Sequence, residues 1–292
     1  MDQFENKVAV ITGGGSGFGR EFALKGAALG MKLVLADVDV KGLAETVEMV
    51  RKLGAEALGV PTDVSDAEQV DALARATLDT FGGVHLLFNN AGVGTGGFVW
   101  ESSANDWAWV FGVNVMGVAN GVRAFTPLML EQNEPAHIVN TASVAGFLAS
   151  PAMGVYNASK HAVVALTETL YHDLAIVGGP VGCSLLCPAF VPTGIAQAER
   201  SRPEGLRNDS PLTVSQQMAD RQLTKAVESG RVSAKDVAEM TFDAVREQRF
   251  YVLTHPKILA SVQLRFDDIL GLRNPTDPLS LKPEVKGVKG VK

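Results

Sequence analysis

Short apolar stretches alternate with longer segments of helical pattern along most of this chain. The apolar stretches occupy residues 8–11, 31–36, 57–60, 84–88, 137–143, 181–187 and 250–254. Runs of this length are typical of strands buried on both faces, and helical segments between such strands favour parallel crossovers. The sequence therefore predicts an α/β fold in which a doubly wound parallel sheet of about seven strands is flanked by helices.

Polar and glycine residues follow five of these predicted strands. They are Gly13, Asp37, Asp63, Asn89 and Ser143. Right-handed crossovers place the carboxyl ends of parallel strands at one edge of the sheet, and ligands of such sheets bind at that edge. We therefore expect these five positions to converge on one site.

A glycine-rich turn, Thr12-Gly-Gly-Gly-Ser-Gly-Phe-Gly19, separates the first strand from a helix. Glycines let the backbone approach a pyrophosphate, whose charge then meets the helix N-terminus; the alternative is a flexible turn. Asp37, about twenty residues later, is placed to bind the adenosine ribose hydroxyls and to repel a 2′-phosphate, although it is also suited to be a turn or cap residue. No Arg or Lys stands at Ser16 or Val38. These features predict NAD(H) rather than NADP(H).

Further cofactor contacts are predicted in the turns after the other strands. A carboxylate at Asp63 can reach an adenine amino group, and Thr193 can bind the nicotinamide carboxamide unless it only caps a helix. The full set of predicted cofactor residues is Gly13, Ser16, Gly17, Phe18, Gly19, Asp37, Asp63, Val64, Asn90, Ala91, Gly92, Tyr156, Lys160, Pro188, Val191 and Thr193.

Tyr156 and Lys160 are four residues apart in a predicted helix, so they share one face. A phenol with a pKa of about 10 is a poor acid–base catalyst at neutral pH, and an adjacent ammonium would lower that pKa. Ser143 can face the phenol across a substrate oxygen, which predicts proton transfer between an alcohol and a carbonyl. The spacing alone also fits an amphipathic helix with a solvated lysine. Asn114, inside a long predicted helix over 104–132, is either a satisfied buried amide or a water holder beside Lys160.

Composition excludes several other classes of function. A net charge of −6 and a pI of about 5.4 argue against nucleic-acid or anionic-membrane partners. Because we find neither a signal peptide nor an apolar run of about 18 residues, we expect no membrane span and a cytoplasmic protein. Cys183 and Cys187 are predicted to be buried and unpaired. The five histidines show no metal-ligand spacing, so no metal site is expected.

No repeat or linker divides the chain. We therefore predict one domain over 1–273, with the polar stretch 194–230 as a substrate lid and 274–292 as a loose tail.

These motifs together resemble the short-chain dehydrogenase/reductase family across roughly residues 4–255. The matching elements are Thr12-Gly-x-x-x-Gly-x-Gly19, Asn89-Asn-Ala-Gly92, Asn114, Ser143, Tyr156-x-x-x-Lys160 and Pro188-x-x-Val191-x-Thr193. The resemblance implies a Rossmann-like fold and a homodimer or homotetramer. It also implies that Tyr156 is the general acid–base, that Ser143 orients the substrate oxygen, that Lys160 lowers the tyrosine pKa and holds the ribose, and that Asn114 holds a relay water.

Two positions depart from the family pattern: Ala189 replaces a usual glycine, and His85 replaces a frequent aspartate. Neither departure removes a predicted catalytic group. Residues 195–203 and 251–256 resemble members that oxidise bulky aromatic (benzylic) alcohols with NAD.

The predicted function is an NAD(H)-dependent interconversion of a secondary alcohol and a ketone. Mostly apolar residues predicted at the strand ends suggest a lipophilic or aromatic substrate, although each also suits a core: Thr95, Phe98, Val144, Phe147, Met153 and Phe190. The alternatives are a catalytically silent NAD-binding regulator or scaffold on the same fold, and a ketoreductase of carrier-bound acyl chains.

Overall fold

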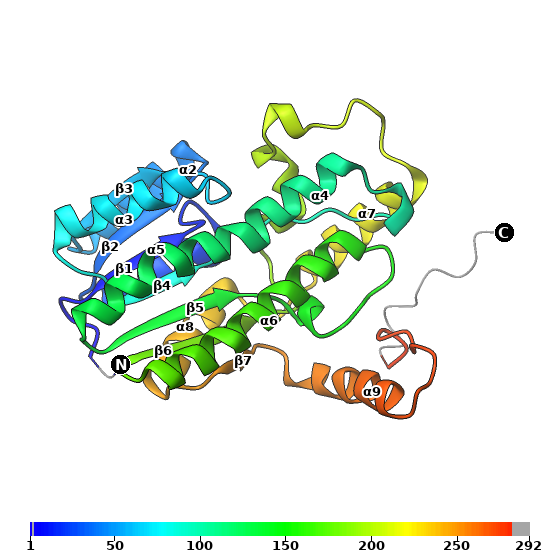
Figure 1. The fold of residues 1–292 in the computed structure, drawn as a ribbon. Helices are drawn as coiled ribbons and strands as arrows, with labels where there is room; N and C mark the ends of the chain where they lie inside the picture. Colours follow the sequence, from blue (N-terminus) through cyan, green and yellow to red (C-terminus); the bar gives the residue numbers. More distant parts are fainter. Residues whose placement is uncertain (2, 282–292) are drawn as a thin grey trace.

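A seven-stranded parallel sheet forms the centre of the molecule, which we describe from a computed structural model over residue 1 and residues 3–281. The strand order is β3-β2-β1-β4-β5-β6-β7 (Figure 1). The strands are β1 Val8–Thr12, β2 Lys32–Asp37, β3 Ala57–Pro61, β4 Leu86–Asn89, β5 Ala136–Thr141, β6 Val181–Cys187 and β7 Tyr251–Leu253. Every pairing is parallel, so the predicted Rossmann-like α/β fold is confirmed.

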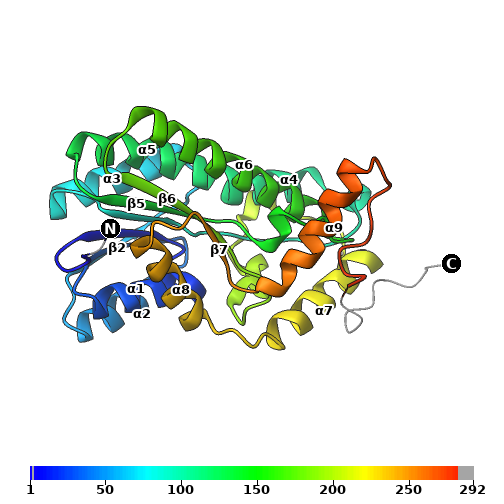
Figure 2. The ribbon, with the colours of Figure 1, turned by 90° about the horizontal axis from the view of Figure 1, so that it is seen from below.

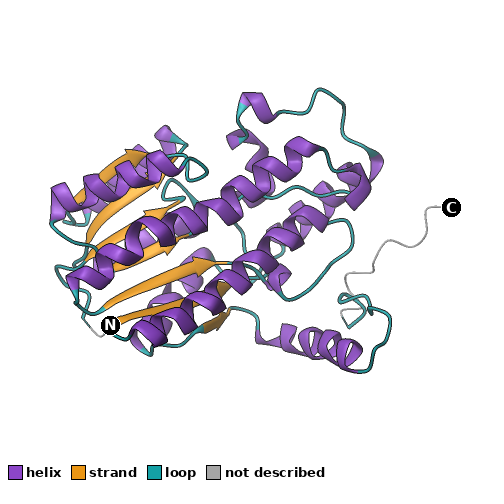
Figure 3. Cartoon of the chain, in the orientation of Figure 1, coloured by secondary structure: helices purple, strands orange, loops and turns teal. Residues whose placement is uncertain are grey.

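Helices cover both faces of this sheet, as the ribbon coloured by secondary structure shows (Figure 3). The α-helices are α1 Gly17–Ala28, α2 Val40–Lys52, α3 Ala67–Phe81, α4 Ala104–Phe111, α5 Gly117–Gln132, α6 Gly154–Val177, α7 Val214–Glu228, α8 Ala234–Arg246 and α9 Leu259–Leu270. Short helices are η1 Val99–Glu101, η2 Gly112–Met116, η3 Val144–Gly146, η4 Gly194–Ser201, η5 Glu204–Leu206 and η6 Pro256–Ile258. Within the described ranges, no helix is long and apolar enough to span a membrane.

Alternate side chains of the strands enter two separate cores. On one face, Ile11 and Leu35 pack with Phe22 of α1 and Phe242 of α8. On the other face, Val10 joins a core with side chains of α3, α5 and α6. Figure 2 shows the two helical layers on either side of the sheet. Because both faces are covered, the strands lack the apolar–polar alternation of a half-exposed sheet.

Local signals set the helix boundaries near the predicted positions. The Asp66 carboxylate accepts the backbone N–H groups of Glu68 and Gln69 and so begins α3. Gly82 ends that helix with a φ of 75°. The segment predicted as one helix over 104–132 is helical throughout, but a π-helical turn, η2, separates α4 from α5.

The chain extends beyond the carboxyl edge of the sheet in three places. The segment between β6 and α8, the α4 region and α9 all project from that side (Figures 1 and 2). The first part of the predicted loose tail is held against α9: Asp268 accepts the Thr276 N–H at 2.9 Å, and Ser261 donates to the Pro278 carbonyl at 3.0 Å. The rest of the predicted tail, 282–292, lies outside the described residues.

Candidate active site

One cavity of about 550 Å³ lies at the carboxyl edge of the sheet. Its wall includes the turns after β1, β2, β3, β4, β5 and β6, together with residues of α6, η4 and α7. Of the five positions expected to converge, Gly13, Asp37, Asp63 and Ser143 line this cavity. Asn89 is the exception: its buried side chain instead donates to Asn140 at 2.8 Å.

The glycine-rich turn forms a close-packed cradle at one end of the cavity. Gly13 has a φ of +66°, and a Cβ there would stand 2.9 Å from the Ala91 Cα. A Cβ on Gly19 would stand 2.0 Å from the Gly13 carbonyl oxygen. The Thr12 hydroxyl accepts the N–H groups of Asn90 and Ala91 at 2.9 and 3.1 Å. The turn therefore requires glycine for backbone contact, and Thr12 fixes it to the end of β4.

Asp37 stands at the edge of the same cradle and stabilises the turn. Its carboxylate accepts the N–H groups of Gly15 at 2.8 Å and of Asp39 at 2.9 Å. Burial raises the pKa of Asp37 above its usual value, although both hydrogen bonds oppose that shift. Each carboxylate oxygen has a second lone pair. Asp37 therefore fills the turn role considered as an alternative and retains the capacity to accept hydroxyl donors from the cavity.

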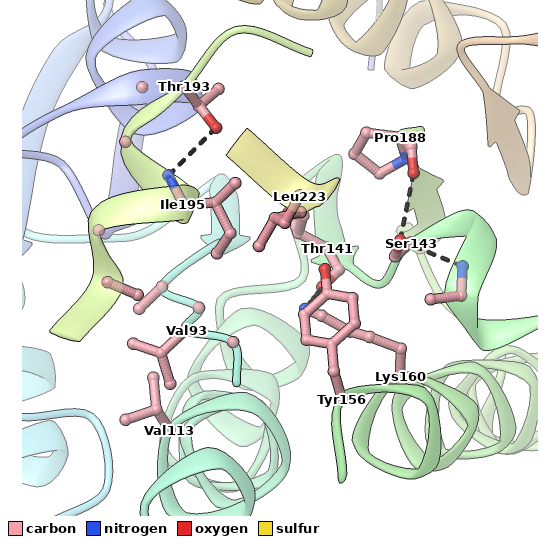
Figure 4. Close-up of a pocket in the computed structure, with 18 of the residues that line it drawn as sticks. Val93, Val113, Thr141, Ser143, Tyr156, Lys160, Pro188, Thr193, Ile195 and Leu223 are labelled. Carbon is pink, nitrogen blue, oxygen red and sulfur yellow. Dashed lines mark hydrogen bonds between the residues drawn. The ribbon is translucent and has the colours of Figure 1, made fainter. Parts of the chain in front are cut away.

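Tyr156, Lys160 and Ser143 lie together in the opposite part of the cavity (Figure 4). Tyr156 and Lys160 come from one face of α6, and Lys160 Nζ donates to the Thr141 carbonyl at 3.0 Å. Ser143 caps η3 by accepting the Ala145 N–H at 3.1 Å and donates to the Pro188 carbonyl at 3.3 Å. The structure thus assembles the predicted phenol, hydroxyl and ammonium.

Burial governs the protonation of these groups. It raises the pKa of Tyr156 above its usual value, and the nearby Ser143 hydroxyl only partly offsets this effect. Burial likewise lowers the pKa of Lys160 to about 8. Lys160 Nζ lies 5.7 Å from the Tyr156 ring centroid. Desolvation of the phenolate thus sets the direction of the Tyr156 pKa in this structure, and the lowering expected from Lys160 stays a prediction.

Asn114 lies behind the cavity wall and not on it. In the π-helical turn its amide accepts the Val93 N–H at 2.9 Å and donates to the Val93 carbonyl and to Ser159. A Cβ on Gly92 would stand 3.5 Å from Asn114 Oδ1 and 3.6 Å from Lys160 Nζ, so both polar atoms face the same glycine. The side chain is a buried amide whose hydrogen bonds are satisfied, and it holds the loop after β4 at Val93, next to Lys160.

The predicted binding residues divide into two groups. Those that line the cavity are Gly13, Ser16, Gly17, Phe18, Asp37, Asp63, Val64, Asn90, Ala91, Gly92, Val144, Met153, Tyr156, Lys160, Pro188, Phe190, Val191 and Thr193. Those that do not are Gly19, Thr95, Phe98, Asn114 and Phe147. Gly19 instead packs on the Gly13 carbonyl.

The predicted substrate positions outside the cavity have other packing partners. Phe98 stacks on Trp100 with ring centroids 4.9 Å apart. Phe147 packs edge-on against Tyr251 at 6.1 Å, and its carbonyl accepts from Arg265. Position in a loop after a strand therefore did not determine which way these rings point.

Apolar residues that the sequence interpretation missed complete the cavity. Trp109 of α4, Leu206 of η5 and Leu223 of α7 line it, as do Ile258 and Leu279 near the C-terminus. These residues come from segments that are distant in sequence. Within each segment they are spaced like ordinary core residues, so the sequence did not mark them as cavity residues. Arg200 was also missed, because it is one of five Arg and Lys residues in the polar segment 194–230 and the sequence does not distinguish it from the others.

Comparison with known proteins agrees with this geometry. The family model described as short chain dehydrogenase matches residues 7–204. This chain belongs to the short-chain dehydrogenase family. A solved short-chain dehydrogenase/reductase of Burkholderia phymatum, in complex with NAD, is 72% identical with a TM-score of 0.95, covering 96% of this chain and 100% of that one.

Curated relatives of this short-chain dehydrogenase are named as oxidoreductases. A CLA biosynthesis dehydrogenase/reductase of Lactiplantibacillus plantarum is 35% identical over 88% of this chain and 91% of its own length. A C alpha-dehydrogenase of Sphingobium sp. strain SYK-6 is 30% identical over 99% of this chain and 94% of its own. The chain is therefore an enzyme of the oxidoreductase class. Among its described residues, no group of three or more His, Cys, Asp or Glu is placed to hold a metal ion.

Proposed function

We propose that this dehydrogenase is NAD(H)-dependent and interconverts a secondary alcohol and a ketone that carry lipophilic or aromatic groups. The observation that carries the proposal is one continuous cavity. It joins the Gly13–Gly17 turn and Asp37 at one end to Ser143, Tyr156 and Lys160 at the other. A dinucleotide bound along the glycine turn would thus extend toward the phenol.

The residues present fit an adenine dinucleotide. Side chains at Gly13 or Gly19 would meet the surrounding backbone at 2.9 and 2.0 Å, so the turn leaves its backbone free to contact a diphosphate. Asp37 presents a carboxylate at the ribose end and would repel a 2′-phosphate, which supports NAD(H) over NADP(H). The related Burkholderia phymatum enzyme, whose complex contains NAD, supports the same choice.

The proposed chemistry needs only the groups described. The cofactor, when bound, supplies the hydride acceptor or donor. Ser143 hydrogen-bonds to the substrate oxygen and orients it. In oxidation Tyr156 accepts the hydroxyl proton, and in reduction it returns that proton to the carbonyl oxygen. Lys160, held by the Thr141 carbonyl, supplies positive charge next to the phenol and the ribose.

Apolar side chains at the far end of the cavity support the substrate class. Trp109, Leu206, Leu223 and Leu279 line it there. We further propose that residues 194–230, which contribute much of this wall through η4, η5 and α7, act as the substrate lid. On family grounds we expect a homodimer or homotetramer, which sedimentation of the purified chain measures directly.

A substrate panel with matched variants tests the proposal. Secondary alcohols and ketones with increasing apolar bulk are assayed with NAD(H) and NADP(H), following the absorbance of the reduced cofactor. We expect NAD(H) turnover that Tyr156→Phe reduces by at least about a hundredfold, since acid–base groups contribute roughly 10²–10⁴-fold. NADH binding to that variant, followed by fluorescence, should persist. Full turnover by Tyr156→Phe, or a tenfold preference for NADP(H), would contradict the mechanism or the cofactor assignment respectively.

A further inference from the structure

We infer that Arg200 binds the diphosphate of the nicotinamide cofactor, an inference that rests on the cofactor binding proposed above. Arg200 belongs to η4, the first helix after the carboxyl end of β6. Its Nη2 lies 3.5 Å from the Ser16 hydroxyl of the glycine-rich turn. The two residues are 184 positions apart in sequence. The segment after β6 therefore brings a guanidinium directly over the turn that fits a diphosphate.

The path of the chain fixes this approach. A Cβ on Gly194 would stand 3.0 Å from Arg200 Nη2, so the guanidinium packs over bare backbone there. A Cβ on Gly17 would stand 3.4 Å from the Thr193 Cβ. Thr193 and Arg200 of this segment thus both face the glycine-rich turn across the cavity. A ligand bound on the turn would contact both residues.

The charges around the cavity leave Arg200 as the available cation at this end. Among the described residues, the cavity lining holds two cations, Lys160 and Arg200, and three carboxylates, Asp37, Asp39 and Asp63. Lys160 is engaged by the Thr141 carbonyl beside Tyr156. A diphosphate would bring further negative charge close to Asp37, and a guanidinium can compensate it through paired N–H donors.

Arg200 is also free to take this role. Its side-chain hydrogen-bond partners are neutral oxygens, Gln197 Oε1 at 3.3 Å and Ser16 Oγ, and within the described residues it forms no ion pair. Two residues later, Arg202 forms a buried pair with Asp106 at 2.8 Å. That pair anchors the segment to α4, whereas the preceding arginine, Arg200 in η4, lines the cavity without a carboxylate partner.

Binding measurements with cofactor fragments test the inference. We would titrate the intact wild-type chain, Arg200→Met and Arg200→Lys with NADH and with ADP-ribose, and measure adenosine by competition. Arg207→Met is the matched control, since Arg207 is an exposed arginine of the same segment outside the cavity lining. We expect Arg200→Met to weaken NADH and ADP-ribose by about tenfold each, with a shallower dependence on salt. The affinity of Arg200→Met for adenosine should equal that of wild type, and Arg207→Met should bind all three ligands like wild type. Arg200→Lys should retain part of the affinity for NADH and ADP-ribose.

The outcomes separate this inference from the proposed function. If the wild-type chain fails to bind NADH, the proposed function itself is wrong. If wild type and Arg200→Met bind NADH equally, only the inference is overturned. Equal loss of adenosine affinity would show a structural effect, and a raised substrate KM with unchanged NADH affinity would place Arg200 on the substrate. Either of these two results also overturns the inference.

Discussion

The buried pair between Arg202 and Asp106 attaches the segment after β6 to α4, and its contribution to stability can be measured. Arg202 Nη2 lies 2.8 Å from Asp106 Oδ1, and the two side chains are only 2% and 3% exposed. The guanidinium also lies 4.9 Å from the Trp109 ring centroid, and its Nε donates to the Leu206 carbonyl at 2.7 Å. One side chain therefore joins η5, α4 and a wall of the cavity.

Asp106 is held in its ionised form by several donors. Burial would raise the pKa of Asp106, but hydrogen bonds from the Ser103 N–H, Arg202 and Asn208 outweigh burial and lower it. The Ser103 N–H donates at 2.8 Å and Asn208 at 3.0 Å. Because this pKa lies below its ordinary value of 3.8, the stabilisation is complete above that pH and is lost as the pH falls through the lowered pKa.

Arg202→Met should therefore leave the buried Asp106 carboxylate without its cationic partner. Removing one partner of a buried pair costs about 3–5 kcal/mol, and we expect about 3 kcal/mol because Ser103 and Asn208 still contact Asp106. Urea unfolding at one fixed protein concentration measures this cost, and the melting temperature should fall by roughly 6 °C. Arg207→Met, at an exposed position, should change the free energy of unfolding by less than about 0.5 kcal/mol.

A second substitution separates the stranded charge from lost packing. Asp106→Asn keeps an acceptor for the Ser103 N–H but removes the charge, so the double variant with Arg202→Met should regain much of the lost stability. The difference in free energy of unfolding between wild type and Arg202→Met should also become smaller in acid, where Asp106 is protonated in both proteins. An Arg202→Met variant within 0.5 kcal/mol of wild type, or a double variant no more stable than the single one, would refute the reasoning.

Three further predictions follow from the same structure. Alcohol oxidation should rise with pH above neutrality, because burial raises the pKa of Tyr156 and the phenolate is the base; a rate that falls over pH 7–9 would contradict this. Gly121→Ala should destabilise the fold by about 1–3 kcal/mol, because its Cβ would stand only 1.9 Å from Asn89 Oδ1; Gly205→Ala, which meets nothing within 4 Å, is the control in the same thermal scan. Asp37→Ser should narrow the ratio of NADH to NADPH affinity in fluorescence titrations, and an unchanged ratio would show that Asp37 only supports the turn.

Local patterns in the sequence were sufficient to predict the parallel sheet and the residues that carry the proposed reacting groups. The apolar runs predicted the strands because both faces of the sheet are covered, so no alternation was needed to identify them. The positions of Ser143 and of Tyr156 with Lys160 followed from strand ends and helix spacing. Backbone geometry alone therefore brings these side chains to one edge.

Features that depend on packing between residues distant in sequence could not be predicted from the sequence. Phe98 and Phe147 are apolar residues in loops after strands, as Val144 and Met153 are, but their rings pack against Trp100 and Tyr251. The direction of a loop side chain depends on partners that are distant in sequence. The same holds for the Tyr156 pKa, because the spacing shows the lysine but does not show how strongly the surrounding fold desolvates the phenol.

The two ends of the cavity differ in how the chain builds them. The proposed cofactor end is made from turns that directly follow strands, so the topology of the sheet fixes it. The proposed substrate end is made by η4, η5, α7 and residues near the C-terminus such as Leu279, which reach it from outside the sheet. Contacts that hold these segments in place include the Arg202–Asp106 pair and the hydrogen bonds of Pro278 and Thr276 to α9. We therefore expect substitutions at the Arg202–Asp106 pair to change the KM for substrate more than the affinity for NADH, whereas changes in the glycine turn should do the reverse.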